Sequence, residues 1–162
     1  MNDMAHAVLR LLEENKIDHT LAEHPAVFNM EELYAQGLEH CDAIAKNLLV
    51  RDQKKRFYWL LVLYGEKRAD LKALKARLGH GALSFAGAEE LAELLGLMPG
   101  SVTPFGALND KEHRVTLLLD EDYRGKLIGV HPNDNTATVW LPADALVELL
   151  RQQGTTVEFI PF

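Results

Sequence analysis

Lys46 and Asn47 are the first residues whose types suggest chemistry, because they interrupt an apolar segment, AIAKNLLV, at residues 43–50. The segment has the composition of a strand, so alternation places one of the two side chains on a face that should be buried. A buried lysine is costly unless its ammonium group meets solvent in a cleft or an anionic partner. This predicts an anion-binding lysine, although taken alone a lysine that reaches solvent from a strand end explains the pattern slightly better.

Two further segments contain residues suited to a site. The loop at residues 100–106 combines glycines, which permit close approach, with a proline that stiffens it, so its backbone N–H groups could stabilise an oxyanion. His131 stands at the end of an expected strand, before a Pro-Asn-Asp turn, where an imidazole could point into a cleft. A rigid connecting loop and a histidine that packs on its turn are the simpler interpretations. The loop residues are Gly100, Ser101, Val102, Thr103, Pro104, Phe105 and Gly106.

Other catalytic and metal-binding signatures are absent from the sequence. There is no P-loop, no Gly-x-Gly-x-x-Gly and no Gly-x-Ser-x-Gly motif. The seven histidines form no His-x-x-x-His pair and the one cysteine forms no Cys-x-x-Cys pair, so we expect neither a metal nor a cofactor. Cys41 would be a nucleophile only beside a positioned base, which nothing in the sequence marks, and a spectator thiol is the favoured interpretation.

The length of 162 residues and an ordinary globular composition predict one domain, spanning residues 1–162. The N-terminal segment is amphipathic and carries acidic residues, which is atypical of a signal or transit peptide. No apolar run approaches the ~20 residues that a membrane helix needs. With a single cysteine, which suits a reducing compartment, these features predict a cytoplasmic protein without a membrane partner.

The elements that would position these residues alternate irregularly along the chain. Apolar periodicity and capping residues predict helices over residues 4–12, from Asn29 towards Gly37, over 70–78 and 88–95, and from Pro142 onward. Strands are expected at residues 19–23, 43–50, 57–64, 115–119, 127–130, 136–141 and 156–160, with hairpin turns at 51–56 and 131–135. This order predicts an α/β domain of the α+β type, with a mixed, largely antiparallel sheet flanked by helices, rather than a doubly wound parallel sheet.

The charge is distributed unevenly along the chain. The net charge is −7, yet residues 46–77 contain ten Lys and Arg against three acidic residues, while the remainder contains seven against twenty-one. Such asymmetry is consistent with one face that attracts a polyanion. A solvated helix and hairpin is the simpler interpretation of the charge run alone. The acidic remainder favours a short contact over a long duplex footprint.

Together these segments resemble a known family. The sequences AKNL followed by RD at residues 45–52, GSVTPFGAL at 100–108 and VHPNDNTA at 130–137, with a weaker EHP at 23–25, are similar to the freestanding prolyl-tRNA editing domains of the YbaK/ProX (INS-like) superfamily. The hairpin segment looks most like the branch that clears alanyl-tRNA(Pro). The resemblance covers nearly the whole chain. Thr103 departs from it, because many relatives have serine there, but it keeps a hydroxyl.

The resemblance implies a trans-editing deacylase that hydrolyses the ester of mischarged tRNA, foremost Ala-tRNA(Pro). Lys46, Asn47 and His131 would be the catalytic residues, and residues 100–106 would form the substrate pocket. Members of the family are understood to use a substrate hydroxyl or thiol to organise the attack, which would explain the lack of a protein nucleophile. The cations that would contact the tRNA acceptor stem are Arg51, Lys54, Lys55 and Arg56.

Two alternatives remain open at the level of sequence. The substrate could be another small mischarged residue, Ser, Thr or Cys, on tRNA(Pro) or another tRNA. The chain could instead be a noncatalytic module that binds aminoacyl-tRNA or regulates a partner. The acceptor end of tRNA is the expected partner, a prolyl-tRNA synthetase is a candidate second partner, and a monomer is the default expectation.

Overall fold

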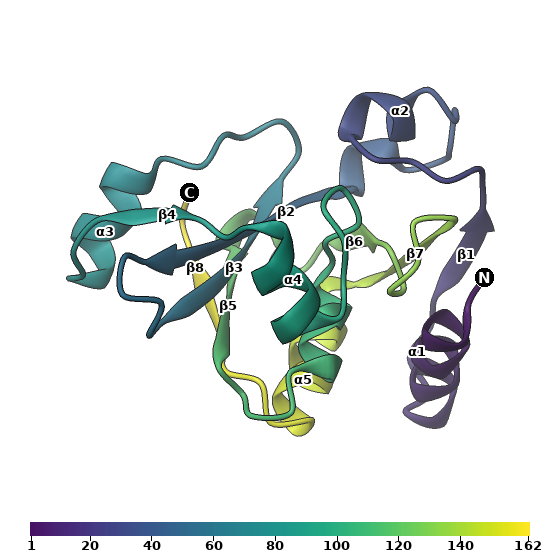
Figure 1. Ribbon diagram of the computed structural model, residues 1–162. Coiled ribbons are helices and arrows are strands. Elements are labelled where there is room, and N and C mark those ends of the chain that lie inside the picture. The colour runs from purple at the N-terminus through teal and green to yellow at the C-terminus, as the bar shows by residue number, and fades with distance from the viewer.

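The computed structural model describes all 162 residues and consists of two β-sheets surrounded by helices (Figure 1). The α-helices are α1 (Asp3–Glu14), α2 (Met30–Tyr34), α3 (Leu71–Leu78), α4 (Ala88–Leu95) and α5 (Ala143–Gln152). The strands are β1 (Thr20–Glu23), β2 (Ala45–Asp52), β3 (Tyr58–Tyr64), β4 (Leu83–Phe85), β5 (Val115–Asp120), β6 (Leu127–Val130), β7 (Ala137–Pro142) and β8 (Val157–Ile160). Short 3₁₀ helices cover Cys41–Ala43, Pro104–Asn109 and Glu121–Tyr123.

The expected mixed, largely antiparallel arrangement is confirmed, but it is divided between two sheets. A three-stranded sheet has the order β1-β7-β6 and is antiparallel throughout. The five-stranded sheet has the order β4-β2-β3-β5-β8, with parallel pairing only between β3 and β5 and between β5 and β8. A single bridge between Ile44 and Gly129 links the two sheets.

Local sequence signals account for most helix boundaries. The side chain of Asp70 accepts a hydrogen bond from the Ala73 amide at the start of α3, which ends at Gly79 in the left-handed conformation. Asn29 begins α2 as predicted, since its side chain accepts a hydrogen bond from the Glu32 amide. The predicted end of α2 at Gly37 is wrong by three residues, because the helix stops at Tyr34 and Gly37 serves a following turn.

The predicted hairpin turn at residues 51–56 is too long. Arg51 and Asp52 belong to β2, where Arg51 pairs with Tyr58 of β3. The Asp52 carboxylate accepts hydrogen bonds from the Arg56 and Phe57 amides and so closes a tighter turn. The hydrogen bond from Phe57 is the main reason why the pKa of Asp52 is lower than usual. Strand β4 was not predicted, because its three residues are too few to show alternation.

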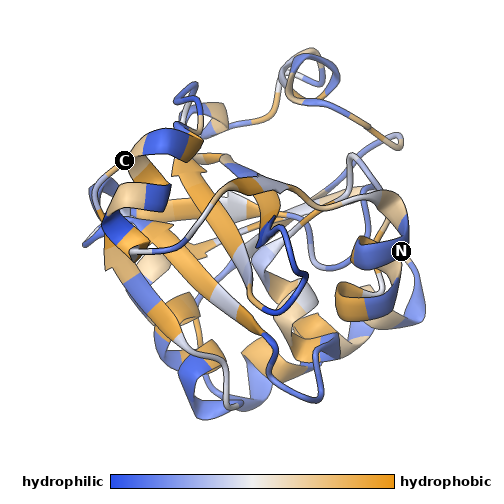
Figure 2. Ribbon diagram, turned by 60° about the vertical axis from the view of Figure 1, so that its left-hand side comes forward, coloured by the Kyte–Doolittle hydropathy of each residue, from blue (hydrophilic) through white to orange (hydrophobic).

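The core lies on both faces of the five-stranded sheet. Alternate residues of β3 enter a cluster of 27 buried residues on one face and a cluster of seven on the other, which explains why the segment YWLLVLY is continuously apolar. Figure 2 shows this hydrophobic colouring along the strands. A smaller cluster of five buried residues, including Leu33 and Trp140, lies under α2. None of the helices has both the length and the apolar character required to cross a membrane.

Candidate active site

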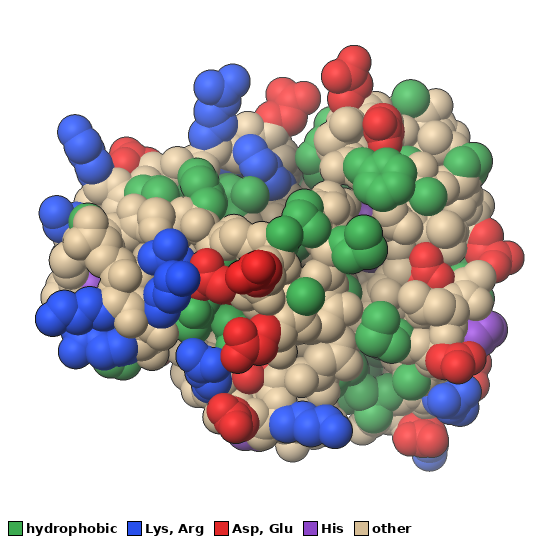
Figure 3. All heavy atoms as spheres, viewed as in Figure 1, with side chains coloured by type: hydrophobic (Ala, Val, Ile, Leu, Met, Phe, Trp, Pro, Cys, Tyr) green, Lys and Arg blue, Asp and Glu red, His purple; other side chains and the backbone are tan.

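A cavity of about 370 Å³ opens between the α2 segment, the free part of β2, the loop after α4 and the ends of β6 and β7. Its volume is within the range of about 300–1,000 Å³ that is typical of small-ligand sites. Of the nineteen residues that line it, twelve are hydrophobic and none is aspartate or glutamate. In Figure 3, hydrophobic side chains gather beneath the α2 segment at the upper right. The cavity is therefore suited to a small ligand that is apolar or carries negative charge.

Lys46 and Asn47 both line this cavity, although neighbouring residues of a strand point to opposite faces. The reason is the topology of β2. Strand β4 pairs only with Val50–Asp52, so the preceding part of β2 has an open edge that forms one wall of the cavity. Asn47 Nδ2 donates to the Ala45 carbonyl at 3.4 Å, whereas Asn47 Oδ1 is buried without a partner. A buried acceptor of this kind requires an explanation, and a ligand donor would supply one.

Lys46 is the only permanently charged side chain that lines the cavity. It is half-buried, and it takes part in none of the six ion pairs of the protein. A cation that is partly removed from water without a carboxylate partner carries a desolvation cost. An anionic group of a ligand would offset this cost, because a charge-assisted hydrogen bond is stronger than a neutral one.

His131 lines the same cavity and is held in one orientation by a backbone contact. Its Nδ1 lies 2.7 Å from the Ala137 carbonyl oxygen. Since a carbonyl only accepts, Nδ1 carries the hydrogen and Nε2 is left as an acceptor. Burial lowers the pKa of His131 below its ordinary value, and the nearby His24 ring acts in the same direction. The imidazole is therefore neutral at pH 7 and acts as a hydrogen-bond acceptor rather than as a cation.

Thr138 and His24 belong to this site but were not predicted to do so. Thr138 is fully buried in β7 and lines the cavity. Its Oγ1 lies 2.9 Å from His24 Nε2, and His24 Nδ1 lies 2.9 Å from the Pro25 carbonyl oxygen. Because Nδ1 donates to that carbonyl, Nε2 of a neutral ring accepts from the threonine hydroxyl. In the sequence, only the weak EHP motif indicated a role for His24. A threonine within an apolar strand is common and does not by itself indicate a functional residue.

The loop at residues 100–106 contributes less of the cavity wall than predicted. Only Gly100 and Val102 of the seven residues line the cavity. Their backbone N–H groups donate to no protein atom, so both remain available to a ligand. The Ser101 hydroxyl instead donates to the Met98 carbonyl, and the Thr103 hydroxyl donates to the His131 carbonyl at 2.5 Å. These two contacts fix the loop, the second directly against the histidine hairpin.

The remaining loop residues are buried away from the cavity. Pro104, Phe105 and Gly106 begin a 3₁₀ helix, and each is buried in the core. The side chain of Asn133, in the histidine hairpin, donates to the Phe105 carbonyl at 3.1 Å. These three residues do not line the cavity; they pack beneath the loop and support it.

The predicted basic residues divide into two groups. Lys54, Lys55 and Arg56 are exposed in the turn between β2 and β3. His80, which follows α3, packs against Phe57 at 4.8 Å between ring centroids, so the basic residues of α3 lie near the same turn. Figure 3 shows Lys and Arg side chains gathered on this left-hand side of the molecule. The turn and α3 thus form one basic surface.

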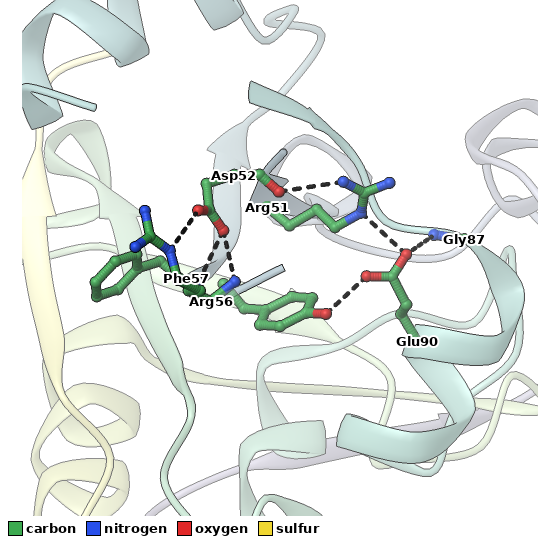
Figure 4. Close-up of polar contacts among 7 residues, drawn as sticks. Arg51, Asp52, Arg56, Phe57, Gly87 and Glu90 are labelled. Carbon is green, nitrogen blue, oxygen red and sulfur yellow. Dashed lines mark hydrogen bonds and ion pairs between the residues drawn. The ribbon is translucent and has the colours of Figure 1, made fainter. Parts of the chain in front are cut away.

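Arg51 is not part of this exposed group. Figure 4 shows its guanidinium directed towards Glu90 of α4, with Nε 3.0 Å from a carboxylate oxygen. Glu90 also accepts hydrogen bonds from the Tyr58 hydroxyl and the Gly87 amide. Burial opposes ionisation of Glu90, but these hydrogen bonds outweigh it and hold the pKa below its usual value. Because its charge is paired in this way, Arg51 connects β2 to α4 and is not a free cation for RNA.

No three or more His, Cys, Asp and Glu side chains lie close enough together to hold a metal ion. Cys41 donates to the Leu38 carbonyl and does not line the cavity. The chemistry that the cavity itself offers is therefore a lysine ammonium group, two backbone amides and a set of neutral acceptors. Such a set can stabilise negative charge that develops on a ligand oxygen and can orient a water molecule.

Known proteins similar to this chain share its fold and sequence. The family model of the aminoacyl-tRNA editing domain matches residues 24–149. The chain is 40% identical over 159 residues to the prolyl-tRNA editing protein ProX of Acetoanaerobium sticklandii, covering 98% of this chain and 97% of that protein. It is 34% identical over 159 residues to the prolyl-tRNA synthetase associated domain-containing protein 1 of Danio rerio, covering 96% and 86%.

Among solved structures, a proposed trans-editing enzyme for prolyl-tRNA synthetase is 26% identical and superposes with a TM-score of 0.73, covering 100% of this chain and 99% of that one. These likenesses confirm the expected YbaK/ProX fold and the expected class of enzyme, an aminoacyl-tRNA deacylase. The chain belongs to the family of aminoacyl-tRNA editing domains.

Proposed function

We propose that this protein is a trans-editing deacylase that removes a wrongly attached small amino acid from tRNA, with Ala-tRNA(Pro) as its preferred substrate. The observation that supports it most is the apolar cavity with Lys46 as its one unpaired charge. The ProX relative is named for prolyl-tRNA editing, which favours tRNA(Pro) as the carrier. The apolar lining favours alanine over a polar residue such as serine.

The reaction requires little from the protein. An aminoacyl ester is an activated bond, and water attacks its carbonyl carbon to give a tetrahedral oxyanion. This intermediate collapses as the bond to the ribose oxygen breaks, and that oxygen takes up the proton that the attacking water has lost, which regenerates the ribose hydroxyl. The products are a free amino acid and uncharged tRNA. The main tasks are to orient the ester and to stabilise the oxyanion.

Each polar group of the cavity has a place in this scheme. Lys46 binds the terminal phosphate or the ester region, and the free amides of Gly100 and Val102 stabilise the oxyanion. Asn47 Oδ1, buried without a partner, accepts a hydrogen bond from the substrate end. His131 accepts a hydrogen bond at Nε2 from the amino acid or from the attacking water and so positions it. This role requires no change in the protonation of the ring. A ribose hydroxyl of the substrate can assist the attack.

Selection among amino acids depends on size. An apolar pocket separates side chains that differ by one methylene by only ~1–3 kcal/mol, but its walls can exclude a larger ring sterically. A pocket that admits alanine and excludes proline spares the correctly charged tRNA. The exposed Lys54, Lys55 and Arg56 contact the acceptor stem in this proposal, and the protein acts as a monomer in the cytoplasm.

A panel of charged tRNAs tests the function directly. Purified protein is incubated with tRNA(Pro) carrying alanine, serine, cysteine or proline, and with Ser- and Thr-charged tRNAs of other families, and release of the amino acid is timed. Alanine is expected to leave fastest and proline to remain attached. If no mischarged tRNA is hydrolysed, while binding persists, the protein is a noncatalytic module.

Replacing Thr138 by valine is expected to lower kcat/KM for Ala-tRNA(Pro) by about tenfold. Valine has the shape of threonine but lacks the hydroxyl, so the cavity loses an acceptor and His24 Nε2 loses its donor. Thr138→Ser keeps the hydroxyl and should retain most of the activity. Steady-state deacylation of both variants checks this, and equal rates in Val and Ser variants would show that the hydroxyl plays no part.

A further inference from the structure

Two unpartnered phenylalanine rings stand at the mouth of the cavity. Phe28, just before α2, is 57% exposed, and Phe85, at the end of β4, is 53% exposed. Both line the cavity, although they come from segments far apart in the sequence. Of the six large hydrophobic residues that are exposed, these two line the cavity and a third, Met98, directly precedes the lining residue Pro99.

Scattered exposed hydrophobic side chains need no explanation, but a group at the entrance of a cavity does. The comparison with Phe57 is informative. Phe57 is 46% exposed, but its ring packs against Trp59 and His80. Phe28 and Phe85 have no aromatic or cationic partner within the protein. More than half of each side chain is exposed, so both can contact a ligand.

We propose that Phe28 and Phe85 form a stacking platform for the unpaired bases at the 3′ end of tRNA. This inference rests on the proposed function, because an ester on the terminal ribose can enter the cavity only if the attached nucleotides pass its mouth. Every base has a π face, so aromatic side chains bind single strands without reading their sequence. Glu31 and Glu32 in the first turn of α2 disfavour phosphate contacts beside Phe28, which leaves the base as the group to be bound there.

Such stacking makes the substrate bind through its nucleotides, separately from the amino acid. The phenylalanine rings bind the nucleotides before the chemical step. They stabilise the ground state and the transition state by the same amount. Their loss should therefore raise KM and leave kcat nearly unchanged. The amino acid preference, which the inner cavity determines, should not change.

The direct test uses tryptophan as a fluorescent reporter of stacking. F28W and F85W are titrated with the trinucleotide CCA, and quenching of tryptophan emission is compared with that of the unsubstituted protein, which already contains Trp59 and Trp140. The matched control is L21W, because Leu21 is 39% exposed on β1 and does not line the cavity. Saturable quenching is expected in F28W and F85W, and none in L21W.

The kinetic test uses leucine, which keeps an apolar side chain but removes the ring. F28L and F85L are each expected to raise KM for Ala-tRNA(Pro) by about tenfold, since stacking on one aromatic side chain is worth a factor of this order. Equal quenching in L21W, or an unchanged KM in both leucine variants, overturns the platform. Because CCA quenching does not depend on hydrolysis, it separates failure of this inference from failure of the proposed deacylation.

Discussion

Replacing Lys46 by methionine is expected to lower kcat/KM for Ala-tRNA(Pro) by at least 100-fold. Methionine retains an unbranched apolar side chain but removes the only permanent charge that lines the cavity. Removal of one preorganised group that stabilises developing charge typically costs about 10²–10³ in rate. Because no carboxylate of the protein pairs with Lys46, the lost interaction is one made with the substrate.

The same substitution should not destabilise the fold. A half-buried ammonium group without an ion partner carries a desolvation cost, which methionine does not. Thermal unfolding of K46M is therefore expected at or above the unfolding temperature of the unsubstituted protein.

Two further variants serve as controls for the loss of activity. K46R keeps the positive charge but places it on a planar group, so it should recover part of the activity. K111M, which removes an exposed lysine from a turn outside the cavity, is the matched control. Retention of activity within threefold in K46M would remove Lys46 from the mechanism.

Replacing Gly100 by alanine is expected to lower kcat/KM by about 10–100-fold, through the shape of the cavity rather than its charge. A Cβ atom at Gly100 would lie 2.4 Å from the Phe28 carbonyl oxygen, a backbone atom that cannot move without its segment. The loop and the residues before α2 must therefore separate, and both carry groups that line the cavity. Misplacement by about 1 Å at a catalytic site can cost roughly 10²-fold in rate.

Gly65 provides a control for the backbone strain alone. Gly100 has φ +84° and Gly65 has φ +60°, so alanine is strained at both, at about 1–2 kcal/mol. A Cβ atom at Gly65 meets nothing within 4 Å. Urea unfolding should show a moderate loss of stability in both variants, but only G100A should lose deacylation. Similar activity in G100A and G65A would mean that the contact with Phe28 does not shape the site.

Much of the local structure could be predicted from the sequence. The N-caps Asn29 and Asp70 and the apolar runs of β3 and β5 are signals that neighbouring residues carry by themselves, and they were predicted at nearly the right positions. Strand β4 and the exact limits of the β2–β3 turn were missed, because a three-residue strand is defined by its partner and not by its own pattern.

The candidate site was predictable only in part. Lys46 and Asn47 stood out because they interrupt an apolar strand, and His131 because it ends a strand before a Pro-Asn-Asp turn; the structure brings all three to one cavity. Arg51 looked like an exposed cation, yet its charge is paired with Glu90, a residue 39 positions away. No local pattern reports a partner at such a distance.

By itself, the sequence determined most of the helices and strands, the family and the residues whose polarity is out of place. Only the tertiary structure decided which residues share the cavity. The tertiary structure leaves an edge of β2 open, so that Lys46 and Asn47 both line the cavity. It also brings Thr138 into hydrogen-bond contact with His24, and it buries the residues from Pro104 to Gly106 beneath the loop. Periodicity indicates which side chains of a helix or strand face the core. A cavity instead forms where elements that are distant in sequence leave space between them.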